Sequence, residues 1–515
     1  MNWRSLGWLM YGCLLMMGHA WAQVAAAPIG LFADHADVGT VLHAGSAKYD
    51  AARHAYTIGG SGENVWAAAD AFQFIWKKME GNFTLKADIS VLGQGGDPHK
   101  KAMLMARQSL DADSAYADVA LHGVGLTSLQ ARDAKGAATH EIQSNVSAPR
   151  RLRLQKYGDE FTMWLAGDDG QFHFAGGSMR VPLAEPFYVG LGVCAHDKDA
   201  VETAEFSNVA LEAMPASSTR TQEYATLETM TVASTDRRVT YVAPGHLEAP
   251  TWTPDSVSLV FRRSCGIEIV PVAGGEPKTV YPRTGLCPDE LHGVSPDGTM
   301  LAVSSVFHNL LGDIYLVPIG GGTARRLTEK SPSTWAGWAA DGKSIVFTGR
   351  RHSEYGIYTI PVAGGEETRL ADAAPPHLDP ECSPDGKYIY FSSSRSGATE
   401  IWRTRLDGSQ PEQVTKDGAG SSCPHVSPDG RLLAFLTPQQ RGSGSFPQGF
   451  TQFLLRVMSL TDGQIRVLAK LIGDRGSMPS PPWSPDSRRI AFVSYQRIRI
   501  DPASPPQATG PVIVK

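Results

Sequence analysis

The chain has no excess of basic residues, no long apolar segment beyond its N-terminus and few cysteines. Its 47 lysine and arginine residues stand against 52 aspartates and glutamates, which gives a net charge of −5 at pH 7. A nucleic-acid surface needs a basic patch, and this composition gives no basis for one. We therefore expect no nucleic-acid partner and no stable insertion into a membrane.

Zinc-binding and thioredoxin-like redox motifs are absent, because no two of the six cysteines are spaced as Cys-x-x-Cys. One of them, Cys13, lies in an apolar run at the N-terminus, and an odd number remains beyond it: Cys194, Cys265, Cys287, Cys382 and Cys423. At least one thiol should therefore be free. The chain also has no G-x-S-x-G, H-E-x-x-H or phosphate-loop motif, so we assign no catalytic residue. A nucleophile and a base that are distant in sequence stay open.

The N-terminus has the pattern of a secretory signal peptide. A positive charge at Arg4 precedes an apolar run from Leu6 to Met17, and small residues then occupy the positions of an A-x-A cleavage site at Ala20 and Ala22. Cys13 lacks the small-residue context of a lipoprotein site. We expect cleavage between Ala22 and Gln23, removal of residues 1–22, and a periplasmic or secreted protein.

A turn motif repeats six times in the C-terminal half and predicts its architecture. The aspartates of the six copies are spaced by 42, 44, 44, 44 and 57 residues: Asp255, Asp297, Asp341, Asp385, Asp429 and Asp486. A period of about 40–45 residues with strand-like runs between turns is typical of a β-propeller with one blade per repeat. Proline presets such a turn and aspartate hydrogen-bonds its local backbone, so we interpret the aspartates as structural.

The last copy is incomplete, and its missing outer strands occur before the first copy. The runs 227–232 and 238–242 have the pattern of the last two strands of a blade, and pairing them with 490–494 would close a ring of six blades. These repeats resemble the PD40 repeats of the TolB-like propeller family over roughly 223–495. TolB itself has an N-terminal domain of a different, α/β kind, so its envelope partners do not carry over.

The 515 residues are too many for one compact core, and the N-terminal part lacks the repeat. Its period-two runs predict an antiparallel β-sandwich: 83–91, 116–121, 151–155, 160–164 and 188–193. Stretches at 80–83, 101–107, 109–117, 189–197 and 206–209 resemble the DUF1349 family, which implies a jelly roll of lectin-like shape. The predicted order is all-β: a sandwich over 23–213, a linker at 214–222 and a six-bladed propeller over 223–515.

A candidate binding site lies where the innermost strands of the blades begin. Equivalent strand starts in a ring meet at one mouth of the central channel, and polar residues gather there: Glu290, His292, His377, Asp379, Glu381 and His425. Such a funnel could bind a divalent metal or an anionic sugar, and some polysaccharide lyases with related propellers hold a metal on histidines there. The alternative interpretation is that these are solvated loop residues with no shared ligand. We predict no obligatory cofactor.

Blade five carries about 13 extra residues near 439–450, which mark either the binding face or a tolerated surface loop. Three tryptophans recur at one blade position and predict contacts between blades: Trp252, Trp338 and Trp483. Three others fit either a core or a sugar platform: Trp66, Trp76 and Trp164. We expect a disulfide between Cys265 and Cys287, a second candidate pair of Cys382 with Cys423, and a buried free thiol at Cys194.

Two functions fit these observations. The first is a monomeric, exported, non-catalytic binding or scaffold protein of the cell envelope that recognises a protein or a glycan through the propeller face. The second is a carbohydrate-active enzyme, a polysaccharide lyase or a hydrolase, with its site at the channel mouth. A stoichiometric divalent metal would favour the enzyme.

Overall fold

The computed structural model describes residues 28–92, 95–215, 221–234, 236–282, 288–305, 312–339, 341–372, 378–439, 451–473, 477–478 and 482–499. Within these ranges every named element is a β-strand, so the all-β prediction is confirmed. Across the same ranges, no helix has the length and apolarity to cross a membrane. The predicted signal peptide lies outside the described residues.

The N-terminal region is built from two sheets. The larger has ten strands in the order β1 (Asp34–Val38), β6 (Phe72–Met79), β15 (Phe187–Cys194), β8 (Lys101–Arg107), β9 (Tyr116–His122), β10 (Thr127–Arg132), β11 (His140–Gln143), β18 (Arg237–Pro244), β17 (Thr221–Thr231) and β39 (Arg489–Arg499). The smaller has seven strands in the order β14 (Phe172–Arg180), β13 (Glu160–Ala166), β12 (Arg151–Tyr157), β7 (Asn82–Leu92), β16 (Asp197–Met214), β3 (Ala55–Gly62) and β2 (Ser46–Asp50).

The two sheets share one hydrophobic core. Alternate residues of each strand face it, as in Phe83, Leu85 and Ala87 of β7, because successive side chains of a strand point to opposite faces. Leu104 of β8 and Val119 of β9 meet them from the larger sheet. Two of the tryptophans left open by the sequence, Trp76 and Trp164, are buried and belong to cores.

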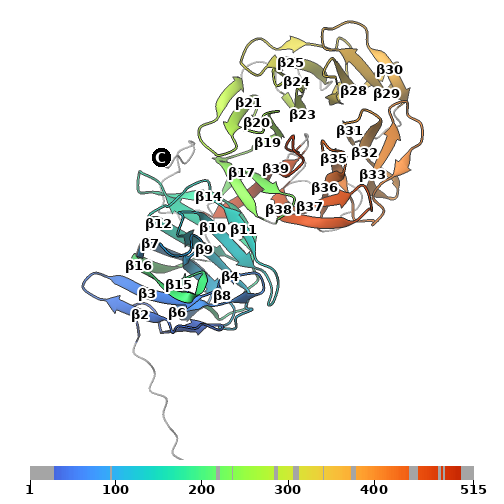
Figure 1. Ribbon diagram of the computed structural model, residues 1–515. Helices are drawn as coiled ribbons and strands as arrows, with labels where there is room; N and C mark the ends of the chain where they lie inside the picture. Colours follow the sequence, from blue (N-terminus) through green and yellow to red (C-terminus); the bar gives the residue numbers. More distant parts are fainter. Residues whose placement is uncertain are drawn as a thin grey trace, which may run out of the picture.

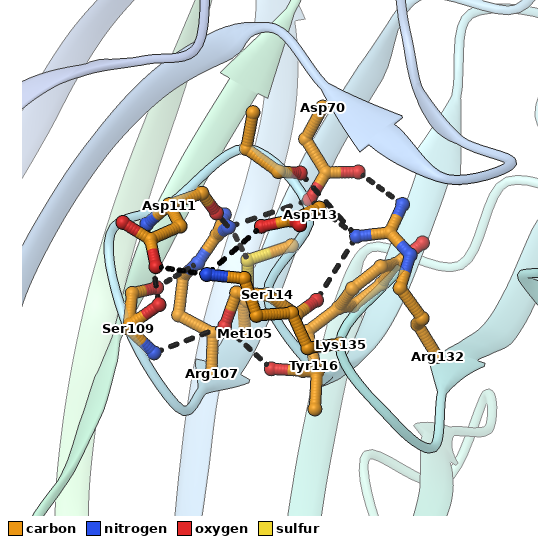
Figure 2. Close-up of polar contacts among 12 residues, drawn as sticks. Asp70, Met105, Arg107, Ser109, Asp111, Asp113, Ser114, Tyr116, Arg132 and Lys135 are labelled. Atoms are coloured by element: carbon orange, nitrogen blue, oxygen red, sulfur yellow. Dashed lines mark hydrogen bonds and ion pairs between the residues drawn. The ribbon is translucent and has the colours of Figure 1, made fainter. Parts of the chain in front are cut away.

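A short hairpin of β4 (Val65–Trp66) and β5 (Ala69–Asp70) is tied to the other face of the ten-stranded sheet by buried charges (Figure 2). Arg132 donates to both oxygens of Asp70, at 2.7 and 3.0 Å, and Arg107 donates to Asp70 Oδ2 at 3.4 Å. All three side chains are inaccessible to solvent. Breaking such a network by removing one partner leaves an uncompensated buried charge, so the hairpin is firmly held.

Five four-stranded blades form most of the C-terminal ring (Figure 1). Blade one has β19 (Glu248–Trp252), β20 (Ser258–Arg263), β21 (Gly266–Pro271) and β22 (Lys278–Tyr281); blade two has β23 (Pro288–Val294), β24 (Met300–Ser305), β25 (Asp313–Pro318) and β26 (Arg325–Arg326). Blade three has β27 (Ser333–Trp338), β28 (Ser344–Arg351), β29 (Glu354–Pro361) and β30 (Thr368–Asp372). Blade four has β31 (Leu378–Cys382), β32 (Tyr388–Ser396), β33 (Ala398–Arg405) and β34 (Glu412–Gln413). Blade five has β35 (Ser422–Val426), β36 (Leu432–Pro438), β37 (Thr451–Ser459) and β38 (Ile465–Gly473).

The repeated turn motif is structural in the way the sequence predicts. In blade four, Asp385 Oδ1 accepts bonds from Ser383 Oγ at 2.6 Å and from the backbone N–H of Lys387 at 3.1 Å. Gly386 follows with a φ of +67°, a conformation that glycine adopts without a steric penalty. The bond from Ser383 is the main cause that lowers the pKa of Asp385. The carboxylate is therefore held in the turn as its anion.

The recurring tryptophans connect neighbouring blades, as predicted. Each donates its indole N–H at 2.8–2.9 Å to a backbone carbonyl that precedes it around the ring: Trp252 to Pro482, Trp338 to Gly293 and Trp483 to His425. Because a buried indole N–H needs an acceptor, these bonds fix the distance between successive inner strands. The tryptophan position is thus an inter-blade contact.

The ring closes through strands from its two ends. β39 pairs antiparallel with β17 over eleven residues, with Leu227 opposite Val493, so the predicted pairing of these segments is confirmed. β18 pairs with the other side of β17, and an isolated bridge joins Trp483 to Ile490. Figure 1 shows these strands between blade one and blade five. They remove the open edge that a broken ring would expose.

The two parts of the chain are joined by more than the predicted linker, of which residues 216–220 lie outside the described residues. β18 pairs in parallel with β11, so one sheet continues from the N-terminal region into the propeller. Phe174 of β14 also packs on Tyr224 of β17, with ring centroids 5.1 Å apart. A Cβ on Gly176 would lie 2.9 Å from side-chain carbons of Thr226, Val239 and Val242. Glycine is required there because the strands approach so closely.

Candidate functional site

The structure places five of the six predicted channel-mouth residues, on strands of three different blades. His377 lies outside the described residues, and Glu290 is on β23 with its side chain outside them. The other four are described and buried: His292 on β23, Asp379 and Glu381 on β31, and His425 on β35. The expectation that these are solvated loop residues is therefore wrong for the four whose side chains are described.

Glu381 and His425 form a pair between blades four and five. His425 Nδ1 lies 2.5 Å from Glu381 Oε2, and Nε2 lies 2.9 Å from the backbone carbonyl of Met478. Both partners only accept hydrogen bonds, so the ring carries a proton on each nitrogen. Burial alone lowers the pKa of His425, but the Glu381 carboxylate and these bonds raise it above its ordinary value. The pair is a buried imidazolium–carboxylate link between blades.

Asp379 belongs to a second contact between the same two blades. Its Oδ2 accepts from Ser392 Oγ at 3.4 Å and lies 3.8 Å from the Cys423 thiol of blade five. Asp379 and Cys423 have φ values of +55° and +53° and sit where the register of each inner strand shifts. The shift is a β-bulge, which re-aims the side chains that follow it. It turns Glu381 and His425 toward each other.

His292 lies apart from this pair, in blade two. Its side chain is fully buried, and burial together with the Arg262 charge lowers its pKa to about 3. Among the described residues, no group of three histidine, cysteine or acidic side chains is arranged to hold a metal ion. In the described part of the ring, the predicted funnel is therefore a set of contacts between and within blades.

The cysteines follow the predictions in part. Cys265 is disulfide-bonded, and its predicted partner Cys287 lies outside the described residues. Cys194 is a buried free thiol as predicted, with its pKa raised by burial to about 11. The candidate pair of Cys382 with Cys423 is contradicted, because neither of these two cysteines forms a disulfide. Cys382 packs against Gly337 of blade three, whereas Cys423 contacts Asp379 of blade four.

A pocket of about 390 Å³, which the sequence did not predict, lies at the junction of the N-terminal region and blade five. One wall comes from the β10–β11 connection, β14 and β18, and the other from β37 and β38. The pocket is lined by apolar side chains that include Ala134, Met179, Leu468, Leu471 and Ile472. Ligand pockets occur preferentially at such domain junctions, in this range of volume.

Charged and polar groups surround the apolar lining of this junction pocket. Lys470 of β38 forms an ion pair of 2.9 Å with Asp133 of the N-terminal region, across the pocket. Arg237 is held by the buried Glu228 through bonds of 2.6 and 2.7 Å. Burial lowers the pKa of His140, which outweighs the opposing effect of Asp133, so this imidazole is neutral at pH 7. The pocket therefore offers one neutral polar ring beside the paired charges of Lys470 and Arg237, and the charged residues Asp159 and Arg180 line it as well.

One feature of the sequence indicates this pocket, namely the insertion in blade five. Gln439 and Gln452 flank the insertion, bond to each other through their backbones at 2.8 Å, and both line the pocket. The inserted residues 440–450 lie outside the described residues. The insertion thus begins and ends at the junction pocket.

Comparisons with known proteins concern the propeller. The family described as the TolB beta propeller domain, PD40, matches residues 350–477. The uncharacterized protein Atu1656 of Agrobacterium fabrum is 35% identical over 272 residues, which cover 52% of this chain and 92% of the relative. A solved structure assigned to TolB of Agrobacterium tumefaciens is 34% identical, with a TM-score of 0.49, and covers 54% of this chain and 100% of its own. TolB from Acinetobacter baumannii is 19% identical, with a TM-score of 0.36, and covers 63% of this chain and 79% of its own. Through its C-terminal half, the chain belongs to the TolB-like β-propeller family.

Proposed function

We propose that this protein is an exported, non-catalytic binding or scaffold protein of the cell envelope, and that its ligand, a protein segment or a glycan, binds in the junction pocket. The observation that carries the proposal is the preformed cavity of about 390 Å³ between the N-terminal region and blade five. Neither part encloses it alone. The apolar lining supplies affinity, and His140 supplies a directional polar contact.

The rigidity of the junction supports binding. The continuous sheet through β11 and β18 and the packing of Phe174 on Tyr224 keep the two walls in register. A preorganised site loses less conformational entropy when a ligand binds. The ion pair between Lys470 and Asp133 also joins the two walls of the pocket.

The enzymatic alternative receives less support. A lyase or hydrolase at the channel mouth would need Glu381 and His425 to reach a substrate. Both side chains are buried and bonded to each other and to Met478, so neither is poised for proton transfer to a ligand.

The finer assignments that we propose concern the fold and the location. In our interpretation β18, β17, β39 and the short segment at Trp483 act as a sixth blade. The N-terminal region is a DUF1349-like jelly roll, which the shared core of its two sheets supports. Cleavage after Ala22 delivers a monomer to the periplasm or the exterior.

The test is a pair of substitutions in one loop. Ala134 lines the pocket, whereas the exposed Ala138 does not, so Ala134→Trp fills the cavity and Ala138→Trp serves as the matched control. Each chain is applied to a glycan array and used to capture proteins from an envelope extract under cross-linking. We expect the ligands of the unsubstituted chain to be kept by Ala138→Trp and lost by Ala134→Trp. Equal binding by both variants refutes a ligand in this pocket.

A further inference from the structure

The face of the ten-stranded sheet that points away from the shared core is buried and carries charged and amide side chains beside an apolar cluster. Alternation along β8, β9, β10 and β11 places charged and amide side chains on this face: Lys101, Asp118, His122, Gln130 and Glu141. Each has an exposed fraction of 4% or less. The hairpin of β4 and β5 contacts this face through Lys101 and Arg132.

Most of these groups satisfy one another. Lys101 Nζ donates to the backbone carbonyl of Val65 at 2.8 Å, to Asn64 Oδ1 at 3.0 Å and to Gln130 Oε1 at 3.2 Å, which uses all three ammonium protons. Glu141 accepts from Gln130 Nε2 at 2.8 Å and from Gln143 Nε2 at 2.6 Å, so both carboxylate oxygens are occupied. The formal charges of this face are therefore already engaged.

Two groups on β9 are left over. Asp118 is fully buried, and neither of its carboxyl oxygens has a hydrogen-bond partner. Its cross-strand neighbours are Met105, which is apolar, and Gln130, whose amide is used elsewhere. His122 Nδ1, four residues along the same face, is also buried without a partner. Unpaired buried polar groups are costly, so two on one face point to a missing hydrogen-bonding molecule.

Burial disfavours the charged form of both leftover groups. Burial raises the pKa of Asp118 well above its ordinary value, against the opposing effect of Lys101. Burial, together with the charge of the neighbouring Lys101, lowers the pKa of His122 to about 3. A carboxylic acid and a neutral imidazole each donate and accept hydrogen bonds, which suits hydroxyl groups. A charged ligand would find no free counter-charge among the groups described here.

Trp66 adds an aromatic surface at the border of this face. It is half-buried in the hairpin, and Lys101 Nζ lies 5.3 Å from its ring centroid. From the sequence, three tryptophans fitted either a hydrophobic core or a sugar platform. Trp76 and Trp164 are buried, whereas Trp66 keeps an exposed surface. An aromatic ring beside a few fixed polar groups is the usual composition of a small-molecule site.

We propose that the polar face of β8–β11 under the β4–β5 hairpin binds a neutral sugar or a related polyol, whose hydroxyl groups pair with Asp118 and His122 while its ring packs beside Trp66. This site is separate from the junction pocket and does not depend on it. Because Asp118 is covered by a hairpin that buried charges hold in place, the ligand can enter only during a transient opening of the hairpin, in which Trp66 moves with it.

The experiment titrates the mature chain with a panel of methyl hexopyranosides, short neutral oligosaccharides and inositol. Tryptophan fluorescence and calorimetry report binding. Asp118→Leu keeps the number and branching of the side-chain heavy atoms but removes the polar atoms, and we expect it to weaken binding at least tenfold. It should also raise the melting temperature, since an unpaired buried carboxyl is lost. Asp118→Asn and Trp66→Ala are second variants that keep the test valid if the leucine variant fails to fold, and both should weaken binding.

The control is Ala134→Trp, which fills the junction pocket and should leave sugar binding unchanged. The proposal is overturned if no member of the panel binds the unsubstituted chain. It is equally overturned if Asp118→Leu gains stability and binds sugar like the parent, in which case ordered water alone occupies the face. Loss of binding in Ala134→Trp alone would assign the sugar to the junction pocket.

Discussion

The imidazole of His425 lies 2.5 Å from the carboxylate of Glu381, and these two residues come from neighbouring blades. The second ring nitrogen bonds to Met478, in the segment that leads toward the closing strands. The sequence predicted that these two residues line a ligand-binding channel mouth. They instead form a buried ion pair inside the ring. Its energetic role can be measured directly.

Removing one member of this pair should destabilise the propeller. Glu381→Leu leaves the His425 imidazolium buried without its counter-charge, at a cost of about 3–5 kcal/mol in the free energy of unfolding. The double variant Glu381→Leu with His425→Leu should recover part of that loss, because no charge is then left unpaired. Urea denaturation followed by circular dichroism checks this, and additive effects of the two substitutions would contradict it.

Histidine protonation should make stability depend on pH in two opposite ways. The pKa of His425 is raised in the folded state, so its contribution is complete below pH 6.5 and is lost as the pH rises through the folded value. The pKa of His292 is lowered to about 3, so its contribution is complete above pH 6.5 and is lost as the pH falls toward 3. Unfolding free energies of His425→Gln and His292→Gln from pH 4 to 9 separate the two. An unchanged pH slope in either variant contradicts its assignment.

A methyl group on Gly176 should disturb the junction. Its φ is +92°, and the added Cβ would meet three side chains at 2.9 Å, so we expect Gly176→Ala to cost about 2 kcal/mol or more. Gly158→Ala is the control: Gly158 also has a positive φ, of +56°, but no atom lies within 4 Å of the added Cβ. That variant should cost about 1 kcal/mol. Thermal unfolding compares them, and equal losses would show that backbone strain alone decides.

Thiol counting tests the covalent assignment. Cys194, Cys382 and Cys423 form no disulfide and Cys265 is disulfide-bonded, so alkylation of the unfolded, unreduced mature chain should add three groups. Reduction before alkylation should raise the number to all five cysteines of the mature chain, and the count of three before reduction identifies Cys287 as the partner of Cys265. Intact mass spectrometry reads both values. A single added group before reduction would revive the bond between Cys382 and Cys423.

The sequence predicts features that depend on local chemistry and on a repeated period. The Ser383–Asp385 turn could be predicted in this way, because the turn motif recurs in each blade. The pairing of Leu227 with Val493 could also be predicted, because the last blade is incomplete and its missing strands occur before the first blade. The burial of Glu381 could not be predicted, because it follows from a β-bulge that no residue type indicates. The parallel contact of Ile142 with Arg237 and the resulting pocket join segments with no shared pattern.

The site residues show the same division. Position in the repeat correctly brought Glu381 and His425 together, because equivalent strand starts are neighbours in any ring. Whether such neighbours face solvent or each other depends on side-chain packing, which a repeat does not encode. The unpaired state of Asp118 is harder still, because it depends on every bond that Gln130 and Lys101 make elsewhere.

The pairing of β17 with β39 has a kinetic consequence. Thr226 bonds to Gln496 across 270 residues, so the ring cannot close until the last strand has been delivered. Contacts this distant in sequence are slow to form, because the entropy of a long loop is lost before the contact is gained. Until then β17 and β18, which also extend the N-terminal sheet, expose an open edge on the chain emerging into its compartment. The final strand therefore controls when both halves become resistant to proteases, and chaperones that cover strand edges would act in that interval.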